Sequence, residues 1–162
     1  MSMATLLEVL EFVREKTLAT VDAVAKLPDP AKALGWRPGP GRAHLAWQLM
    51  HLGATDDRHL HVRMKQGEPK RADYVQRFAG GSTPDDNIPS LDEIRRYLDE
   101  ERQALLAHWR TIPDAALDTK PHEQAPWTYR QWVKVLAWHE AHHQGQAHLT
   151  LNLFKATHGL GA

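Results

Sequence analysis

The stretch Trp138-His139-Glu140-Ala141-His142-His143-Gln144-Gly145-Gln146 lies near the C-terminal end of the chain, inside a long run with helical periodicity. In a helix of 3.6 residues per turn, His139 and His143 lie one turn apart on one face, so both imidazoles can reach one metal ion. Their row continues through apolar or small residues: Trp132, Leu136, Ala147, Thr150 and Phe154. The pair therefore faces the expected core, where each ring needs a hydrogen-bond partner or a metal.

A third histidine decides between a metal site and a pair of ordinary core histidines. Eleven histidines occur in 162 residues, so a pair spaced by four can arise by chance. The segment 43–66 offers His51, which lies on one helical row with Trp47, Ala54 and Thr55. By contrast, His59 and His61 lie among charged residues, a pattern that indicates a solvent-exposed helix end. His51 is therefore the best third ligand in the chain.

Apolar residues at helical spacing predict four amphipathic helices. The first covers residues 4–27 and is stopped by prolines, and the second covers 43–66. Ser90 with Glu93, and Thr128 with Gln131, have the capping-box pattern that opens the third and fourth helices. Gly159 is the natural stop of the fourth. The sequence shows no strand-period alternation, so we predict an all-α fold in which residues 1–162 form a single four-helix-bundle domain.

Two connectors interrupt this helical pattern. Residues 35–42 are rich in glycine and proline, and Trp36 within them either lines a pocket or covers the end of the bundle, the second being favoured. Residues 67–89 form a long stretch with little periodicity, which predicts a functional flap or a crossover that spans the bundle. The charged run 99–102 in the third helix is expected to face water.

Composition excludes several classes of partner. Lysine plus arginine equals aspartate plus glutamate at 20 each, and no basic run suggests a phosphate-binding surface, so we expect no nucleic-acid partner. No segment approaches 18 apolar residues and the N-terminus lacks a signal-peptide pattern, so we expect no membrane association. The chain has no cysteine, which excludes thiolate ligands and fits a reducing cytoplasm. We expect a soluble cytoplasmic protein.

The motifs together carry a family resemblance. His139-x-x-x-His143-x-Gly145-Gln146 follows Ala46-Trp47-Gln48-Leu49-Met50-His51 by about ninety residues. This combination resembles the DinB-like (DinB/YfiT) superfamily of metal-dependent enzymes, and the likeness covers essentially the whole chain. The resemblance implies a four-helix bundle of up-down-down-up topology, in which the long connector between the second and third helices crosses the bundle. It also implies a divalent metal held by His51, His139 and His143, and a homodimer, since members are often dimers.

The family does not fix the reaction. Some relatives are S-transferases or isomerases that use low-molecular-weight thiols such as bacillithiol or mycothiol, and others are proposed hydrolases. Three neutral imidazoles would leave coordination positions open, as in catalytic zinc sites, where a bound water or thiol loses its proton readily. All-nitrogen ligation leads us to expect zinc or nickel, with iron, manganese or copper as alternatives. Because the chain has no cysteine, any thiol must be a cosubstrate from outside.

The segment also matches the HExxH signature of zinc proteases, with Glu140 after the first histidine. Those enzymes take a third ligand from a downstream glutamate, or from a histidine six residues beyond the second ligand. Here Leu149 occupies that position and no acid follows Glu140, which argues against a protease. Glu140 is a candidate general base, but a water-facing carboxylate is at least as well supported. Gln146 is a better candidate to hold a metal-binding histidine by a hydrogen bond.

The sequence therefore predicts a metal-dependent enzyme that activates a thiol or water for attack on a small electrophilic substrate. The alternative is a bundle that binds metal without catalysis and serves as a stress or interaction protein. The two hypotheses predict different surroundings for the metal. An enzyme should place an open metal position at the base of a cleft, walled by Trp36, Trp47 or the 67–89 connector, whereas a non-catalytic bundle should cap or fill it.

Overall fold

All regular structure in the part of the chain described by the computed structural model, residues 2–161, is helical, which confirms the all-α prediction. The elements are α1 (Met3–Ala25), α2 (Pro30–Gly35), α3 (Leu45–Asp57), η1 (Arg58–Met64), α4 (Ala72–Arg77), α5 (Leu91–Trp109), η2 (Asp114–Ala116) and α6 (Tyr129–Thr157). η1 is a π-helical continuation of α3, and η2 is a single 3-10 turn. Within residues 2–161, no helix is long and apolar enough to cross a membrane.

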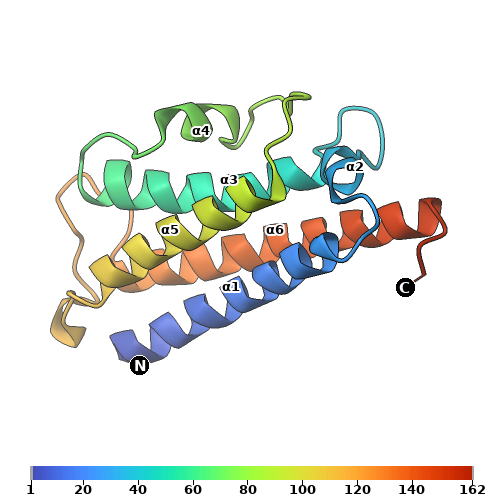
Figure 1. Ribbon diagram of the computed structural model, residues 1–162. Helices are drawn as coiled ribbons and strands as arrows, with labels where there is room; N and C mark the ends of the chain where they lie inside the picture. Colours follow the sequence, from blue (N-terminus) through green and yellow to red (C-terminus); the bar gives the residue numbers. More distant parts are fainter. Residues whose placement is uncertain (1, 162) are drawn as a thin grey trace.

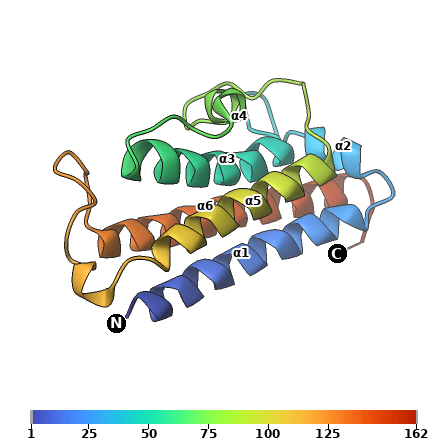
Figure 2. The ribbon, with the colours of Figure 1, turned by 60° about the vertical axis from the view of Figure 1, so that its left-hand side comes forward.

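The long helices α1, α3, α5 and α6 lie side by side (Figure 1). α1 packs on α6 and α5, and α3 packs on α5 and α6. In the view of Figure 1, α1 and α6 run from left to right along the chain, whereas α3 and α5 run from right to left. Two consecutive long helices, α3 and α5, therefore point the same way, and the chain between them returns along the outside of α3, carrying α4 (Figure 2).

Local capping signals set the starts of the last two long helices. Ser90 and Thr128 each accept the N–H of the residue three positions on, and the side chains at those positions, Glu93 and Gln131, return a bond to the cap. At the far end of α6, Gly159 has φ of 66°, a left-handed conformation that suits glycine. The Leu160 N–H then reaches the Lys155 carbonyl at 2.9 Å, which closes the helix as a Schellman motif.

The structure modifies two of the predicted elements. The first helix ends at Ala25, and Pro30 opens the short helix α2, because Asp29 caps it by accepting the Lys32 N–H at 2.9 Å. The predicted helix over 43–66 is present, but its last part is wound as a π-helix from Arg58 to Met64. Hydrophobic periodicity does not distinguish this wider winding from an α-helix.

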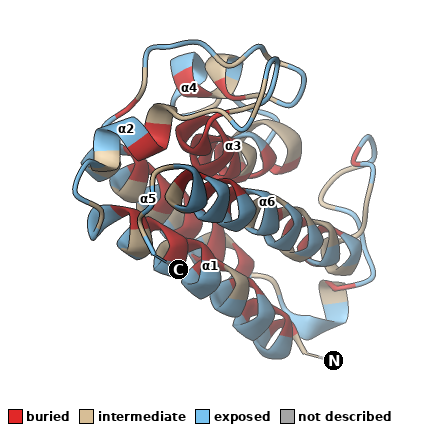
Figure 3. Cartoon of the chain, turned by 90° about the vertical axis from the view of Figure 1, so that its right-hand side faces the viewer, coloured by how far each residue is buried: buried red, intermediate tan, exposed pale blue. Residues whose placement is uncertain are grey.

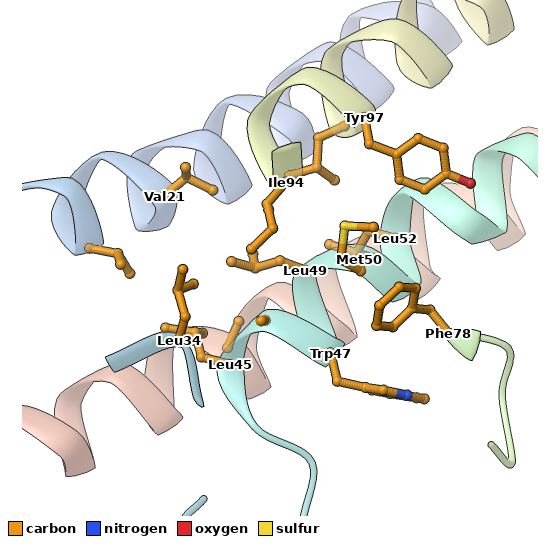
Figure 4. Packing of buried hydrophobic residues seen from close by; sticks show 14 of the residues in the cluster. Val21, Leu34, Leu45, Trp47, Leu49, Met50, Leu52, Phe78, Ile94 and Tyr97 are labelled. Carbon is orange, nitrogen blue, oxygen red and sulfur yellow. The ribbon is translucent and has the colours of Figure 1, made fainter. Parts of the chain in front are cut away.

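Two clusters of buried apolar side chains form the core. The first lies around the start of α3 and α5 and contains Leu49, Met50 and Ile94 (Figure 4). The second lies around the end of α5 and the start of α6 and contains Trp109 and Trp132. Figure 3 shows that buried residues follow the inward sides of the long helices, while the outward sides are exposed.

Each long helix, with η1 counted as part of α3, contributes one charged residue to a buried layer, located between its residues of the first cluster and those of the second. These four residues are Arg14 of α1, Asp56 of α3, Arg102 of α5 and Glu140 of α6, and we call them the buried charge layer. Asp56 Oδ2 accepts from Arg14 Nη2 and from Arg102 Nε, both at 3.0 Å. Glu140 accepts from Arg14 Nε at 2.6 Å and also from Arg102. The two positive and two negative charges therefore compensate one another away from water.

This layer corrects the prediction that residues 99–102 face water. Glu101 and Arg102 are buried, with 0% and 2% of their surface exposed, whereas Glu100 is exposed. The prediction was wrong because the partners of these charges lie on other segments, Lys70 of the connector for Glu101 and the helices α3 and α6 for Arg102, which a helical pattern does not report. Asp57 is also buried rather than part of a solvated helix end, and it accepts the backbone N–H groups of Lys70 and Arg71 at 2.8 and 2.9 Å.

Candidate metal centre

The structure brings together the three histidines that the sequence singled out. α3 supplies His51, and α6 supplies His139 and His143 one turn apart. One ring nitrogen from each lies within 4.8 Å of the others. Nε2 of His51 is 3.1 Å from Nε2 of His139, and the ring centre of His143 is 4.5 Å from each of the other two. Three ring nitrogens that could bind one metal ion are thus gathered around one point.

The crossover after α4 orients His51. Its Nδ1 lies 2.6 Å from the carbonyl oxygen of Phe78, the residue that follows α4. A carbonyl only accepts, so Nδ1 carries the proton and Nε2 keeps a lone pair directed at the other histidines. Trp47 stacks on His51 with ring centres 4.9 Å apart, and its Nε1 donates to Ser82 Oγ at 3.1 Å. The ring of His51 is therefore fixed from two sides.

The three histidines are neutral near pH 7. Burial, and then the neighbouring His143 and His51, lower the pKa of His139 to about 3. Burial and then His51 lower the pKa of His143 to about 4, and burial lowers the pKa of His51 as well. Neutral imidazole is the form that binds a metal, so no proton has to be removed before binding.

These residues fit a divalent metal on two further observations. Nδ1 of His143 is buried and has no hydrogen-bond partner among residues 2–161, whereas buried polar atoms are nearly always satisfied. The bond from His51 to the Phe78 carbonyl is the kind that usually orients a metal-binding histidine. A donor set of three imidazoles suits zinc, nickel and other transition metals better than magnesium or calcium.

The histidines lie in a cleft of about 480 Å³. Trp47 lines it, as predicted, and the 67–89 connector supplies part of its wall through Phe78, Gly80 and Gly81. Trp36 does not line this cleft, so its assignment to the pocket was wrong. Instead, its ring packs edge-on against Phe154, with centres 6.0 Å apart, and covers the end of the bundle.

The structure does not bring Glu140 into this cleft. Its carboxylate accepts from Arg14, from Arg102 and from Thr17 Oγ1, the last at 2.8 Å. A neighbour of His139 on a helix points about 100° away, which here is into the buried charge layer. The alternative expectation, a water-facing carboxylate, is wrong because only 1% of Glu140 is exposed. Glu140 therefore has a structural role, and the geometry gives no support to its use as a general base.

Gln146 lies beside the histidines of α6, and its side-chain hydrogen bond to His143 partly offsets the lowering of the pKa of His143 by burial. Gln146 is exposed, and its Nε2 lies 3.0 Å from Nε2 of His142, which is also exposed. His51 is held by a different group, the Phe78 carbonyl, a backbone group that no side-chain pattern reveals.

Sequence reasoning missed several residues of the cleft. His59 was expected to face water, but it is buried, lines the cleft and accepts the Trp132 Nε1 proton on Nδ1 at 2.6 Å. The sequence does contain a signal for His59, because it follows His51 by eight residues, about two helical turns, and so lies near the same face of the helix. Arg58, Arg63 and Trp127 line the cleft too.

Comparison of the sequence with known proteins identifies one matching family. A sequence model of the DinB superfamily matches residues 9–147, which is most of the chain and includes all three histidines. A search of curated proteins finds none that matches the chain.

Proposed function

The chain belongs to the DinB superfamily, and on this premise we propose that it is a metal-dependent enzyme that acts on a small molecule. His51, His139 and His143 would hold one divalent ion, zinc or nickel in preference to iron or manganese. The observation that carries the proposal is the convergence of three neutral histidines in a cleft of about 480 Å³. A bundle that only binds metal has no need of a cleft beside the ion, so the cleft favours an enzyme over that alternative.

The proposed chemistry is attack by a thiol or by water on a small electrophile. A divalent metal on three imidazoles, when bound, makes the proton of a coordinated thiol or water more acidic and so supplies a nucleophile near neutral pH. The thiol would be a low-molecular-weight cosubstrate, because the chain has no cysteine. The reaction is then a thiol S-transfer or, with water, a hydrolysis.

The chain's own residues would prepare this site. The Phe78 carbonyl holds the proton of His51 on Nδ1, and Trp47 stacks on a face of that ring. Trp127 and Leu136 give the cleft apolar walls that exclude water and position a substrate. Asp57 fixes the start of the crossover through two backbone N–H groups, which keeps the cleft wall in place.

We further propose that residues 1–162 form one four-helix-bundle domain with up-down-down-up topology. The helix directions visible in Figure 1 support this order, as does the return of the chain outside α3 before α5 begins. In this arrangement α3 and α6 pack together, which is what brings His51 to His139 and His143.

The proposal is tested by metal-dependent turnover. Untagged protein is loaded in turn with zinc, nickel, iron or manganese and assayed with a thiol panel that includes bacillithiol and mycothiol, using 1-chloro-2,4-dinitrobenzene as the electrophile and 4-nitrophenyl acetate for hydrolysis. We expect turnover that requires the metal, is lost in His51→Ala and is kept in His148→Ala, which removes an exposed histidine of α6. Metal binding without turnover in any combination would favour the non-catalytic bundle.

A further inference from the structure

The cleft beside the histidines carries positive charge that no acid balances. Arg58 and Arg63 line it, and its described lining contains no aspartate or glutamate. The chain as a whole is neutral, with 20 basic and 20 acidic residues, so this imbalance is local. Arginine keeps its charge at all working pH values, whereas the histidines of the cleft are neutral.

Neither arginine has an ion-pair partner within residues 2–161. Elsewhere, arginines such as Arg77 and Arg130 are paired with aspartates at 3.0 and 2.7 Å. Arg63 is half-buried, and its pKa is lowered first by burial and then by the nearby Arg58. Arg58 is exposed, so only the Arg63 guanidinium is partly desolvated. An anion beside both groups would offset their mutual repulsion.

The π-helical winding of η1 explains how two arginines reach the same cleft. Arg58 and Arg63 are the first and the sixth residues of η1 (Arg58–Met64). In an α-helix, residues five apart point about 140° away from one another. In a π-helix, whose hydrogen bonds join residues five apart, such residues lie about one turn apart on one side. π-helical turns are frequent at functional sites, and this one aligns both charges with the histidines.

Aromatic groups line the same cleft and add an apolar contact surface. His59 stacks on Trp127 with ring centres 6.2 Å apart, and both line the cleft together with Trp47. A ligand that fits this lining has an apolar body and an anionic end. The guanidinium fork pairs with carboxylate and with phosphate oxygens in a bidentate manner.

We propose that the small molecule bound beside the three histidines carries an oxyanion group, a carboxylate or a phosphate, that is held by Arg58 and Arg63. This inference rests on the proposed function, since it names the class of substrate or cosubstrate that the same cleft receives. Arg58 and Arg63 are the residues that select it.

Calorimetric titration of the metal-free protein at pH 7 tests this site without any metal chemistry. The probes are succinate, inorganic phosphate and the uncharged succinamide. We expect at least one anion to bind at least tenfold more tightly than succinamide, with the stronger of the two anions identifying the carboxylate or the phosphate as the natural group. Arg63→Gln and Arg58→Gln should each weaken that anion at least fivefold, and Arg63→Lys should weaken it less.

The matched control is Arg96→Gln, which removes an exposed arginine of α5 and should leave the affinity unchanged. Anions that bind no better than succinamide, or Arg58→Gln and Arg63→Gln proteins that fold normally and bind like the wild type, would overturn the inference. Anion selectivity without metal-dependent turnover would reject the proposed reaction but keep the anion site. Turnover without anion selectivity would reject the site alone.

Discussion

The Nε2 atoms of His51 and His139 lie 3.1 Å apart, although 88 positions separate the two residues along the chain. His51 carries its proton on Nδ1, so without a metal His139 must supply the proton that these two nitrogens share. Binding of a metal to both nitrogens requires that proton to move to the other nitrogen of His139. The packing of α3 against α6 therefore creates a contact that a divalent ion can replace.

Glu140 stabilises the fold rather than supporting catalysis. Burial raises the pKa of Glu140, but the nearby Arg14 and then Arg102 lower it by more. The pKa therefore lies below its usual value, and the carboxylate is charged. Glu140→Gln leaves two buried arginines with one acid, and we expect the free energy of unfolding to fall by about 3–5 kcal/mol. Urea unfolding measures this change, and metal affinity should be unaffected.

The control for that substitution is Glu100→Gln on α5. Glu100 pairs with Lys70 at the surface, at 3.2 Å and with both side chains about half exposed, so its loss should cost less than about 1 kcal/mol. Equal small losses in the two variants would show that the buried charge layer does not stabilise the protein. Loss of turnover at unchanged stability in Glu140→Gln would restore the general-base role.

Two helical glycines, Gly53 in α3 and Gly145 in α6, should respond in opposite ways to alanine. A Cβ at Gly53 would lie 2.6 Å from Tyr97 Cδ1, and the Tyr97 hydroxyl is held by Asp57 at 3.1 Å. Gly53→Ala should therefore destabilise the fold by about 1–3 kcal/mol through overpacking. Among the described residues, a Cβ at Gly145 meets nothing within 4 Å, so Gly145→Ala should stabilise α6 by about 0.5–1 kcal/mol.

Chemical denaturation of both variants checks this pair. Equal effects of the same sign would mean that helix propensity, and not the approach of α3 to α5, governs both positions. The result also bears on the family motif that includes Gly145, because no packing contact among residues 2–161 requires a glycine there.

The stability of the metal-free protein should depend on the ionisation of His59. Burial, and then Arg63, lower its pKa to about 3, whereas an unfolded histidine titrates near 6.5. Between these values the unfolded chain binds the extra proton, so stability is complete above about pH 6.5 and falls as the pH drops toward 3. One proton gives a slope of at most about 1.4 kcal/mol per pH unit, hence about 2 kcal/mol by pH 5.

His59→Gln isolates this contribution, because glutamine can still accept the Trp132 proton but does not titrate. Urea unfolding of the metal-free wild type and variant at pH 7 and pH 5 measures it. We expect the wild type to lose more stability than the variant over that range. Equal losses would mean that His59 is solvated or protonated in the folded protein.

Parts of the fold were predictable because their causes are local. The caps at Ser90 and Thr128, and the stop at Gly159, each depend on residues within six positions, so the sequence pattern contains them. The π-helical winding of η1 and the helix α4 in the crossover have no such pattern. Periodicity reports that a face is apolar, and it does not report a change of winding within a helix.

The residues of the site likewise fall into those that local patterns predict and those that depend on long-range contacts. His51, His139 and His143 were found because each lies on an apolar row of its own helix. The burial of Arg102 and Glu140, the partner of His51 at the Phe78 carbonyl and the cleft position of His59 all depend on contacts between segments distant along the chain. Such contacts appear only when the packing of α3 against α5 and α6 is known.

The most direct test of the central claim is elemental analysis of untagged wild-type protein beside His51→Ala, His143→Ala and His148→Ala. Three converging neutral histidines predict one divalent ion per chain in the wild type, its loss in the first two variants and its retention in His148→Ala, whose histidine is exposed. No bound metal in the wild type, and none taken up from added zinc, nickel, iron or manganese, would contradict the account. Full metal content in His51→Ala would contradict the ligand set.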